Sequence, residues 1–244
     1  MTEIWAHRGA SAHAPENTLA AFELALRQGA EGVEFDVQLS SDGAPVLIHD
    51  EKVDRTTNGR GWVKDQPLAA LQALDASYGR DGFARARIPT LPEALELLAP
   101  SGVTINIELK NSEIRYSGLE EIVLEAVDTF GICDRVVLSS FNHYSLKRLQ
   151  DLGARCPLGV IYTDPLYRPW RYAAELGAAA LHPPRRLILG PGYVRRAHEA
   201  GLAVRPWVVN SERDLRRMFR LGVDAVFTDV PDVALAVRAA SLTS

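Results

Sequence analysis

The sequence predicts an α/β protein built around a parallel sheet, and an eight-stranded barrel is the favoured architecture. Short apolar segments alternate with amphipathic segments along most of the 244 residues. This alternation is typical of β-α units, in which helices connect parallel strands. Eight strand-like segments are present, and a parallel barrel closes well with eight strands. The alternative is an open doubly wound sheet, which is disfavoured because no Gly-x-Gly-x-x-Gly turn follows the first strand.

The elements are expected in a regular order. Mostly apolar runs predict strands at Ile4–His7, Val33–Leu39, Val103–Lys110, Arg135–Ser140, Pro157–Tyr162, Ala178–His182, Leu202–Trp207 and Asp224–Thr228. Amphipathic patterns predict helices at Asn17–Gly29, Leu91–Ala99, Leu119–Phe130, His143–Leu152, Trp170–Leu176, Gly192–Ala200, Glu212–Leu221 and Pro231–Ala240. Several of these helices end at a glycine, such as Gly29 and Gly222, which can adopt the left-handed conformation that stops a helix.

The alternation is interrupted between residues 50 and 88. Turn pairs such as Asn58-Gly59 and Asp81-Gly82 dominate this segment, and no β-α unit is recognisable in it. A loop of this length is usually functional or a small insertion. Since it follows the second strand, it leaves the barrel on the face that carries active sites. We therefore expect one domain over residues 1–244, with an insertion at about 50–88.

Composition excludes several classes of function. The chain has 27 Lys and Arg residues against 31 Asp and Glu residues, a formal net charge of −4, which argues against nucleic-acid binding. No apolar run approaches the ~18 residues of a membrane span, so no stable membrane anchoring is expected. The amino terminus lacks the pattern of a secretory signal, which predicts a cytoplasmic protein. Cys133 and Cys156 are too few for a disulfide framework and are expected to be reduced thiols.

Carboxylates interrupt the apolar pattern of two neighbouring strands. Glu34 and Asp36 alternate with the apolar residues of the strand at 33–39, and Glu108 does so in the strand at 103–110. These acids are therefore expected to point into the barrel, which normally contains Val, Ile and Leu. Three carboxylates so close together repel one another unless a cation lies between them. Oxygen ligands select a hard ion, Mg²⁺ or Ca²⁺, rather than zinc.

Basic residues near these acids allow two interpretations. Arg8 and Lys110 could neutralise the carboxylates in a structural salt-bridge network. Alternatively, the planar fork of Arg8 and the point charge of Lys110 suit a phosphate group. His7 and His49 both end strand-like runs, and imidazoles that titrate near neutral pH can form an acid/base pair. A hard metal ion together with these side chains favours phosphoryl transfer or hydrolysis.

An ordered set of short motifs runs through nearly the whole chain. The motifs are His7-Arg8-Gly9, Pro15-Glu16-Asn17-Thr18, Glu34-Phe35-Asp36-Val37, His49-Asp50, Ile107-Glu108-Leu109-Lys110, Ser140-Phe141-Asn142, Trp207 and Thr228-Asp229-Val230-Pro231. In order and spacing this set resembles the glycerophosphodiester phosphodiesterases. The resemblance implies a TIM (β/α)8 barrel with a small insertion after the second strand. It also implies hydrolysis of glycerophosphodiesters, such as glycerophosphocholine or glycerophosphoethanolamine, to glycerol 3-phosphate and an alcohol.

The resemblance assigns the chemistry to the residues already singled out. It implies that His7 and His49 are the catalytic acid/base pair. It further implies that Glu34, Asp36 and Glu108 hold one divalent cation, Mg²⁺ or Ca²⁺.

The same resemblance implies a substrate-binding set. Arg8 and Lys110 would bind the phosphate, and Glu16 would support the first loop. Phe141 and Trp207 would form walls of the glycerol pocket.

Two other functions stay open at this stage. One is a phosphodiesterase of the lysophospholipid type on the same barrel, and the other is a catalytically inactive binding module. The intact histidines and acids argue against the binding module, because binding alone does not need an acid/base pair. His182 ends the sixth expected strand, and the sequence does not decide whether it lines the pocket.

Overall fold

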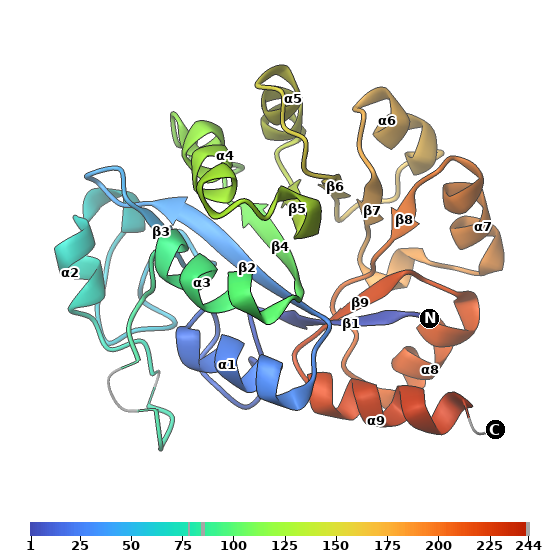
Figure 1. The fold of residues 1–244 in the computed structure, drawn as a ribbon, viewed down its shortest axis with the longest axis horizontal. Coiled ribbons are helices and arrows are strands. Elements are labelled where there is room, and N and C mark those ends of the chain that lie inside the picture. Colours follow the sequence, from blue (N-terminus) through green and yellow to red (C-terminus); the bar gives the residue numbers. More distant parts are fainter. Residues whose placement is uncertain (78, 84–85, 243–244) are drawn as a thin grey trace.

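Eight parallel strands form a nearly closed barrel in the computed structural model, which describes residues 1–77, 79–83 and 86–242 (Figure 1). The barrel strands are β1 (Glu3–His7), β2 (Gly32–Leu39), β4 (Thr104–Leu109), β5 (Val136–Ser140), β6 (Leu158–Ile161), β7 (Ala180–His182), β8 (Ala203–Val204) and β9 (Ala225–Thr228). Their order in the sheet is β8-β7-β6-β5-β4-β2-β1-β9. The backbone N–H of Asp224 donates to the Val204 carbonyl at 2.9 Å and joins the two ends of this order. The predicted barrel is therefore confirmed, and the open sheet is wrong.

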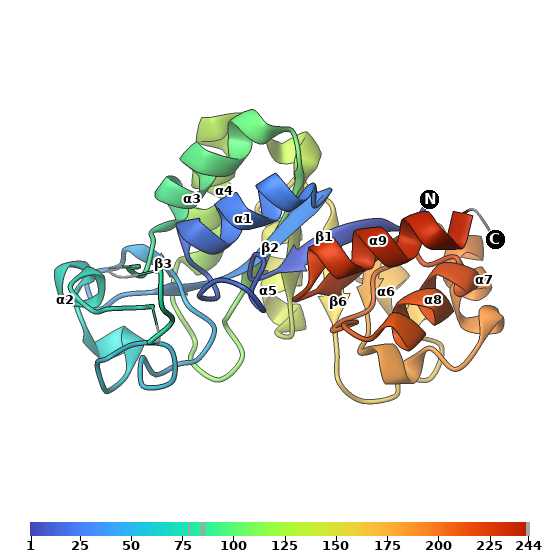
Figure 2. The same cartoon turned by 90° about the horizontal axis from the view of Figure 1, so that it is seen from below.

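Helices lie around the outside of the barrel (Figure 2). They are α1 (Leu19–Gln28), α3 (Leu91–Leu98), α4 (Leu119–Phe130), α5 (His143–Asp151), α6 (Pro169–Glu175), α7 (Pro191–Glu199), α8 (Glu212–Leu221) and α9 (Pro231–Leu242). Short 3₁₀ turns lie at Val63–Asp65, Ala99–Ser101, Cys133–Arg135 and Arg185–Leu187. The predicted helix stops at Gly29 and Gly222 have φ angles of 85° and 71°, the left-handed conformation expected there. In the described part of the chain, no helix combines the length and the apolar character that crossing a membrane requires.

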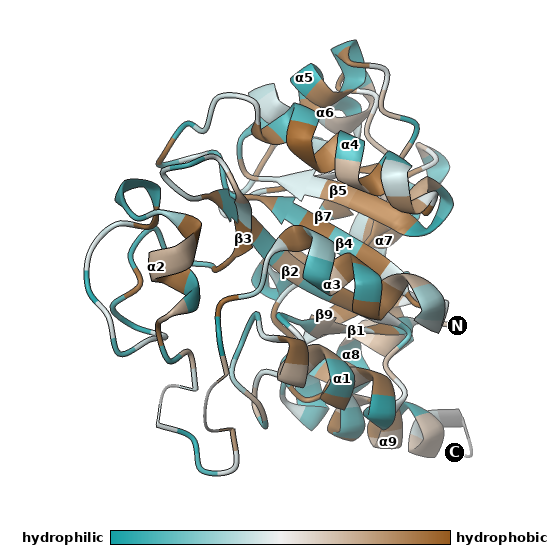
Figure 3. Cartoon of the chain, turned by 60° about the vertical axis from the view of Figure 1, so that its left-hand side comes forward, coloured by the Kyte–Doolittle hydropathy of each residue, from teal (hydrophilic) through white to brown (hydrophobic). Residues whose placement is uncertain are grey.

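Alternating side chains separate an apolar outer layer from the barrel interior. Val33, Phe35 and Val37 of β2 are fully buried and belong to the main hydrophobic core, which the strands share with the surrounding helices (Figure 3). Inside the barrel, the ring of Trp5 lies directly over Gly32. A Cβ atom at Gly32 would come within 2.5 Å of this ring, so the close approach requires glycine. The interior is therefore filled by a large side chain near the amino-terminal ends of the strands, and the polar residues gather at the other end.

The segment after β2 forms a small lobe beside the barrel (Figure 1). It contains β3 (Pro45–Leu47), which pairs antiparallel with β2, and the short helix α2 (Leu68–Gln72). The lobe has a hydrophobic cluster of its own, made of Val46, Ile48, Val53, Val63, Leu71, Ala76 and Ile88. The strand β3 lies in the strand-like run that precedes His49. The helix α2 has only five residues, too few to produce a periodic pattern, so the sequence does not predict it. Residues 78, 84 and 85 of the expected insertion lie outside the described residues.

The two cysteines correct one expectation. Cys133 and Cys156 form a disulfide, so the prediction of reduced thiols is wrong. Cys133 lies shortly before β5 and Cys156 shortly before β6, and these strands are neighbours in the sheet. The register brings the two Cα atoms to 5.0 Å, within the range that a disulfide spans. A count of cysteines contains no information on this pairing across the sheet.

Candidate active site

A cavity of about 190 Å³ opens among the carboxyl ends of the barrel strands. Residues from β1, β2, β4, β6, β7 and β9, and from the segments that follow β1, β3, β5 and β8, line it. Among the predicted site residues, those lining the cavity are His7, Arg8, Glu34, His49, Glu108, Phe141 and Trp207. Asp36, Lys110 and Glu16 contact this group from the side, as described below. The structure therefore brings all the predicted site residues into one region of the barrel.

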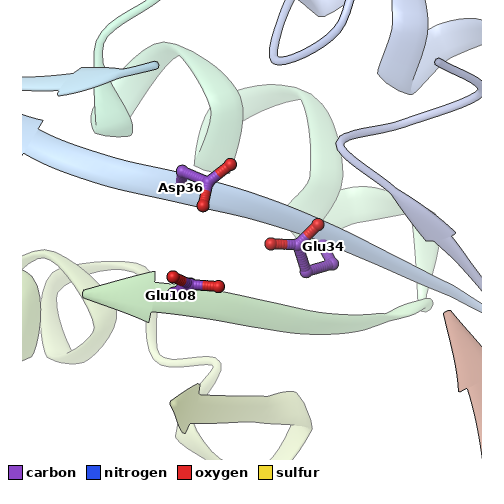
Figure 4. A group of neighbouring side chains, drawn as sticks. All are labelled: Glu34, Asp36 and Glu108. Carbon is purple, nitrogen blue, oxygen red and sulfur yellow. The ribbon is translucent and has the colours of Figure 1, made fainter. Parts of the chain in front are cut away.

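Three buried carboxylates form the centre of this region (Figure 4). Glu34 and Asp36 lie on β2 and Glu108 lies on β4, where Asp36 and Glu108 are paired in register. One oxygen atom from each carboxylate lies within 4.8 Å of the others, and the three residues are 1 to 9% exposed. Burial raises the pKa of Glu34 well above its usual range, and the charges of Asp36 and Glu108 raise it further. Burial also raises the pKa of Glu108.

The pKa of Asp36 is shifted in the opposite direction. Burial alone would raise its pKa, but the charges of His49 and Arg8 and a hydrogen bond from Asn17 hold the pKa of Asp36 well below its usual range. Asn17 Nδ2 donates to Asp36 Oδ2 at 2.9 Å. The cluster therefore combines one carboxylate with a lowered pKa, that of Asp36, and two with raised pKa values, those of Glu34 and Glu108. Such an arrangement of oxygen ligands fits a divalent cation such as Mg²⁺ or Ca²⁺.

Two basic side chains flank the cluster. Arg8 Nε lies 3.3 Å from Asp36 Oδ2, and Lys110 Nζ lies 3.2 Å from Glu108 Oε1. The backbone N–H of Arg8 donates to Glu34 Oε2 at 2.8 Å, and Arg8 has a φ of 56°, a conformation that a non-glycine residue adopts at some energetic cost. This conformation places both the N–H and the side chain of Arg8 against the acids. With all three carboxylates ionised, two cations would leave one negative charge unbalanced, so these salt bridges neutralise the cluster fully only if one carboxylate holds a proton.

His7 has a carboxylate partner from the opposite end of the chain. Its Nδ1 atom lies 2.7 Å from Asp229 Oδ1, after β9. Asn210 Nδ2 and Ser11 Oγ also donate to Asp229, at 2.6 and 3.0 Å. Burial opposes ionisation of Asp229, but the hydrogen bonds from His7, Asn210 and Ser11 lower its pKa to about 2. Because a carboxylate can only accept, the Nδ1 atom of His7 carries the hydrogen and Nε2 is available for proton exchange.

His49 has the same type of partner, supplied by the lobe. Its Nδ1 atom lies 2.7 Å from Asp50 Oδ1. Arg55 donates to both oxygens of Asp50, at 2.7 and 2.9 Å, and also to both oxygens of Glu16, at 2.7 and 2.8 Å. The hydrogen bonds from Arg55 are the main cause that lowers the pKa of Asp50 to about 2. Glu16 in turn accepts from Arg8 Nη1 at 2.9 Å, so Arg55 connects the His49 side of the pocket to the Arg8 side.

Sequence reasoning missed these supporting residues. Asp50 and Asp229 belong to two of the sequence motifs, directly after His49 and after the last strand, but the motifs alone assign them no role. Arg55 and Asn210 stand in loops without any pattern, and only the folded chain shows what they contact.

Aromatic rings form the other wall of the pocket. Phe141 and Trp207 meet edge to face, with ring centroids 5.7 Å apart. The indole N–H of Trp207 donates to the backbone carbonyl of His182 at 2.8 Å, which fixes the ring beside the pocket. Ile161 and Phe227 extend this wall. The pocket therefore has an ionic side and an apolar side.

Comparison with known proteins agrees with this geometry. The chain matches the glycerophosphoryl diester phosphodiesterase family over residues 7–233. It belongs to this family. It is 42% identical over 236 residues to a glycerophosphodiester phosphodiesterase of Caldanaerobacter subterraneus, covering 96% of each chain. It is 44% identical over 244 residues to that of Bacillus altitudinis, covering 98% of each chain.

A solved structure is similar over almost the full length. An Oleispira antarctica phosphodiesterase in complex with its product sn-glycerol-3-phosphate superposes with a TM-score of 0.90 and 34% sequence identity, covering 98% of this chain and 97% of that chain. The expectation of a phosphoric diester hydrolase on a TIM-like barrel is therefore confirmed.

We predict that Glu34→Gln stabilises the metal-free protein more as the pH rises. The pKa of Glu34 is higher in the folded than in the unfolded chain, so the folded state holds an extra proton between these two values. The free energy of unfolding of the wild type therefore falls as the pH increases through this window. Each pKa unit of difference corresponds to about 1.4 kcal/mol, and glutamine does not titrate. Urea unfolding in the presence of a chelator, at about pH 5 and about pH 8, measures the effect.

Glu96→Gln is the matched control, since Glu96 is exposed on α3 and should show no such gain. Equal pH dependence of wild type and Glu34→Gln would contradict the prediction and show that burial beside two other carboxylates does not raise the pKa of Glu34.

Proposed function

We propose that this chain hydrolyses glycerophosphodiesters such as glycerophosphocholine or glycerophosphoethanolamine, releasing glycerol 3-phosphate and an alcohol. The observation that carries the proposal is the buried cluster of Glu34, Asp36 and Glu108, placed in one pocket with two carboxylate-supported histidines. The product complex of the Oleispira relative supports the choice of the glycerol 3-phosphate half.

In this proposal Glu34, Asp36 and Glu108 hold one divalent cation, Mg²⁺ or Ca²⁺. When bound, the cation supplies positive charge against the phosphate oxygens. Arg8 and Lys110 bind the same phosphate from either side of the acids, through a bidentate fork and a point charge. The negative charge of the cluster keeps both side chains protonated and close to the pocket.

In this proposal His7 and His49 transfer the protons of the reaction. One imidazole accepts the proton of the nucleophile through Nε2, and the other donates a proton to the departing alcohol oxygen. Asp229 and Asp50 hold the two Nδ1 atoms and stabilise each ring when it becomes positively charged. The nucleophile is water or a hydroxyl of the substrate itself, and the second route passes through a cyclic phosphate.

The remaining predicted residues bind the substrate. Phe141 and Trp207 contact the carbon skeleton of glycerol, and Glu16 keeps Arg8 in position. We further propose that residues 1–244 act as one catalytic domain, in which the insertion at about 50–88 contributes Asp50 and Arg55. A cytoplasmic location stays a prediction from the sequence, and the disulfide argues against it, since disulfides persist mainly in oxidising compartments.

The proposed function predicts release of glycerol 3-phosphate from glycerophosphocholine, measured with a coupled enzyme assay. Treatment with a strong chelator should abolish this release, because it removes the divalent cation whose positive charge faces the phosphate oxygens. Addition of Mg²⁺ or Ca²⁺ should restore it. Full activity of protein shown to be free of metal would refute the metal site, and release of choline phosphate instead would refute the proposed bond specificity.

The histidine pair gives a second prediction. His7→Ala and His49→Ala should each lower kcat by ~10²–10⁴-fold, because each removes a proton-transfer group from the transition state. The double variant should lose much less than the product of the two effects. His198→Ala, an exposed histidine on α7 paired with Asp224, is the control and should retain wild-type turnover. Wild-type turnover in His7→Ala would show that this histidine is structural.

A further inference from the structure

One buried polar side chain of β2 has no part in the mechanism above. Gln38 stands two residues after Asp36, in the same row of the strand, and is fully buried. Its amide nitrogen Nε2 lies 2.9, 3.1 and 2.8 Å from the backbone carbonyl oxygens of Ile48, His49 and Asp50. One side chain therefore holds three consecutive residues of the segment after β3, which carries the second histidine of the proposed acid/base pair.

The orientation of the Gln38 amide follows from these contacts. Carbonyl oxygens only accept, so the atom that faces all three is the amide nitrogen, which shares its two hydrogens among them. The amide oxygen Oε1 accepts from the hydroxyl of Tyr116 at 2.9 Å. Burial and the nearby charges of Glu51 and Asp65 raise the pKa of Tyr116, so the hydroxyl keeps the hydrogen that it donates. Tyr116 and the three carbonyls together fix the amide in one orientation.

Tyr116 is itself tied to the helices around the barrel. It lies between β4 and α4, and its backbone N–H donates to Asn111 Oδ1 at 2.6 Å. The amide nitrogen of Asn111 donates to Glu120 Oε1 on α4 at 2.9 Å and to Ser145 Oγ on α5 at 3.2 Å. The Tyr116 hydroxyl therefore has a fixed position from which it orients Gln38.

The segment that Gln38 holds determines where the imidazole of His49 lies. His49 and Asp50 stand outside any helix or strand, and His49 Nδ1 lies 2.7 Å from Asp50 Oδ1. Their side chains are 32 and 31% exposed, so packing alone leaves them free to move. A proton-transfer group acts only within hydrogen-bonding distance of the reacting atom, so a shift of this backbone would lower the rate.

We propose that Gln38 is a positioning residue for His49, and that Tyr116 acts through Gln38 by orienting its amide. The inference rests on the proposed function, in which His49 transfers a proton. Neither Gln38 nor Tyr116 is among the described residues that line the pocket. Loss of either hydrogen-bonding group should therefore lower kcat and leave KM unchanged, because proton transfer belongs to the transition state.

Steady-state kinetics with glycerophosphocholine and a saturating concentration of Mg²⁺ or Ca²⁺ test this role. Tyr116→Phe removes only the hydroxyl and should lower kcat by ~3- to 10-fold, as expected of one hydrogen bond. Gln38→Met keeps a similar volume without the amide and should lower kcat by ~10²-fold, as expected of a displaced catalytic group. In a His49→Ala background neither substitution should lower the remaining turnover further, because no imidazole is left to position.

Tyr162→Phe is the matched control. The hydroxyl of Tyr162 is also hydrogen-bonded to another side chain, that of Tyr193, and Tyr162 is as buried as Tyr116, but it belongs to the segment after β6. This variant should keep the wild-type kcat. If Gln38→Met fails to fold, as judged by thermal melting, Tyr116→Phe decides the test.

The outcomes separate this inference from the proposed function. A wild-type kcat in Tyr116→Phe, or a change in KM alone, refutes the positioning role. An equal fractional loss in the wild-type and His49→Ala backgrounds also refutes it, because the substitution then acts on the fold or on the metal site and not through His49. Wild-type turnover in His49→Ala refutes the proposed role of His49 itself, and the positioning role with it.

Discussion

Repulsion among three buried carboxylates is the constraint around which this barrel is organised. Glu34, Asp36 and Glu108 lie within 4.8 Å of one another in an environment that disfavours charge. An apolar interior would be more stable at these positions, as in most parallel barrels. Arg8 and Lys110 compensate only two of the three charges that the ionised carboxylates would carry. A divalent cation would relieve the remaining repulsion and would in turn attract a phosphate group.

The layer of residues behind the histidines is built from distant parts of the chain. Asp229 reaches His7 from the end of β9, and Arg55 reaches both Asp50 and Glu16 from the lobe after β3. The lobe, which is stabilised by its own hydrophobic cluster, therefore holds Arg55 at the edge of the pocket. Residues outside the barrel strands thus keep the two imidazole rings in defined orientations.

The sequence contained most of the fold and the centre of the site, for identifiable reasons. The inward direction of Glu34 and Asp36 follows from the two-residue period of a strand, and the eight strands follow from repeated apolar runs. The hydrogen bonds of Asp229 and Arg55 depend on contacts between remote segments, which no local pattern encodes. The Cys133–Cys156 disulfide was missed for the same reason, since it depends on the register of β5 and β6.

The most direct test of the account is a crystal structure of the protein grown with Mn²⁺, which prefers the same oxygen ligands as Mg²⁺ and scatters anomalously. The account predicts a single strong anomalous peak in the barrel mouth, within ~2.0–2.6 Å of carboxylate oxygens from Glu34, Asp36 and Glu108. An empty site at this position, with the carboxylates bound by Arg8 and Lys110 alone, would contradict the account and make the cluster a structural salt-bridge network.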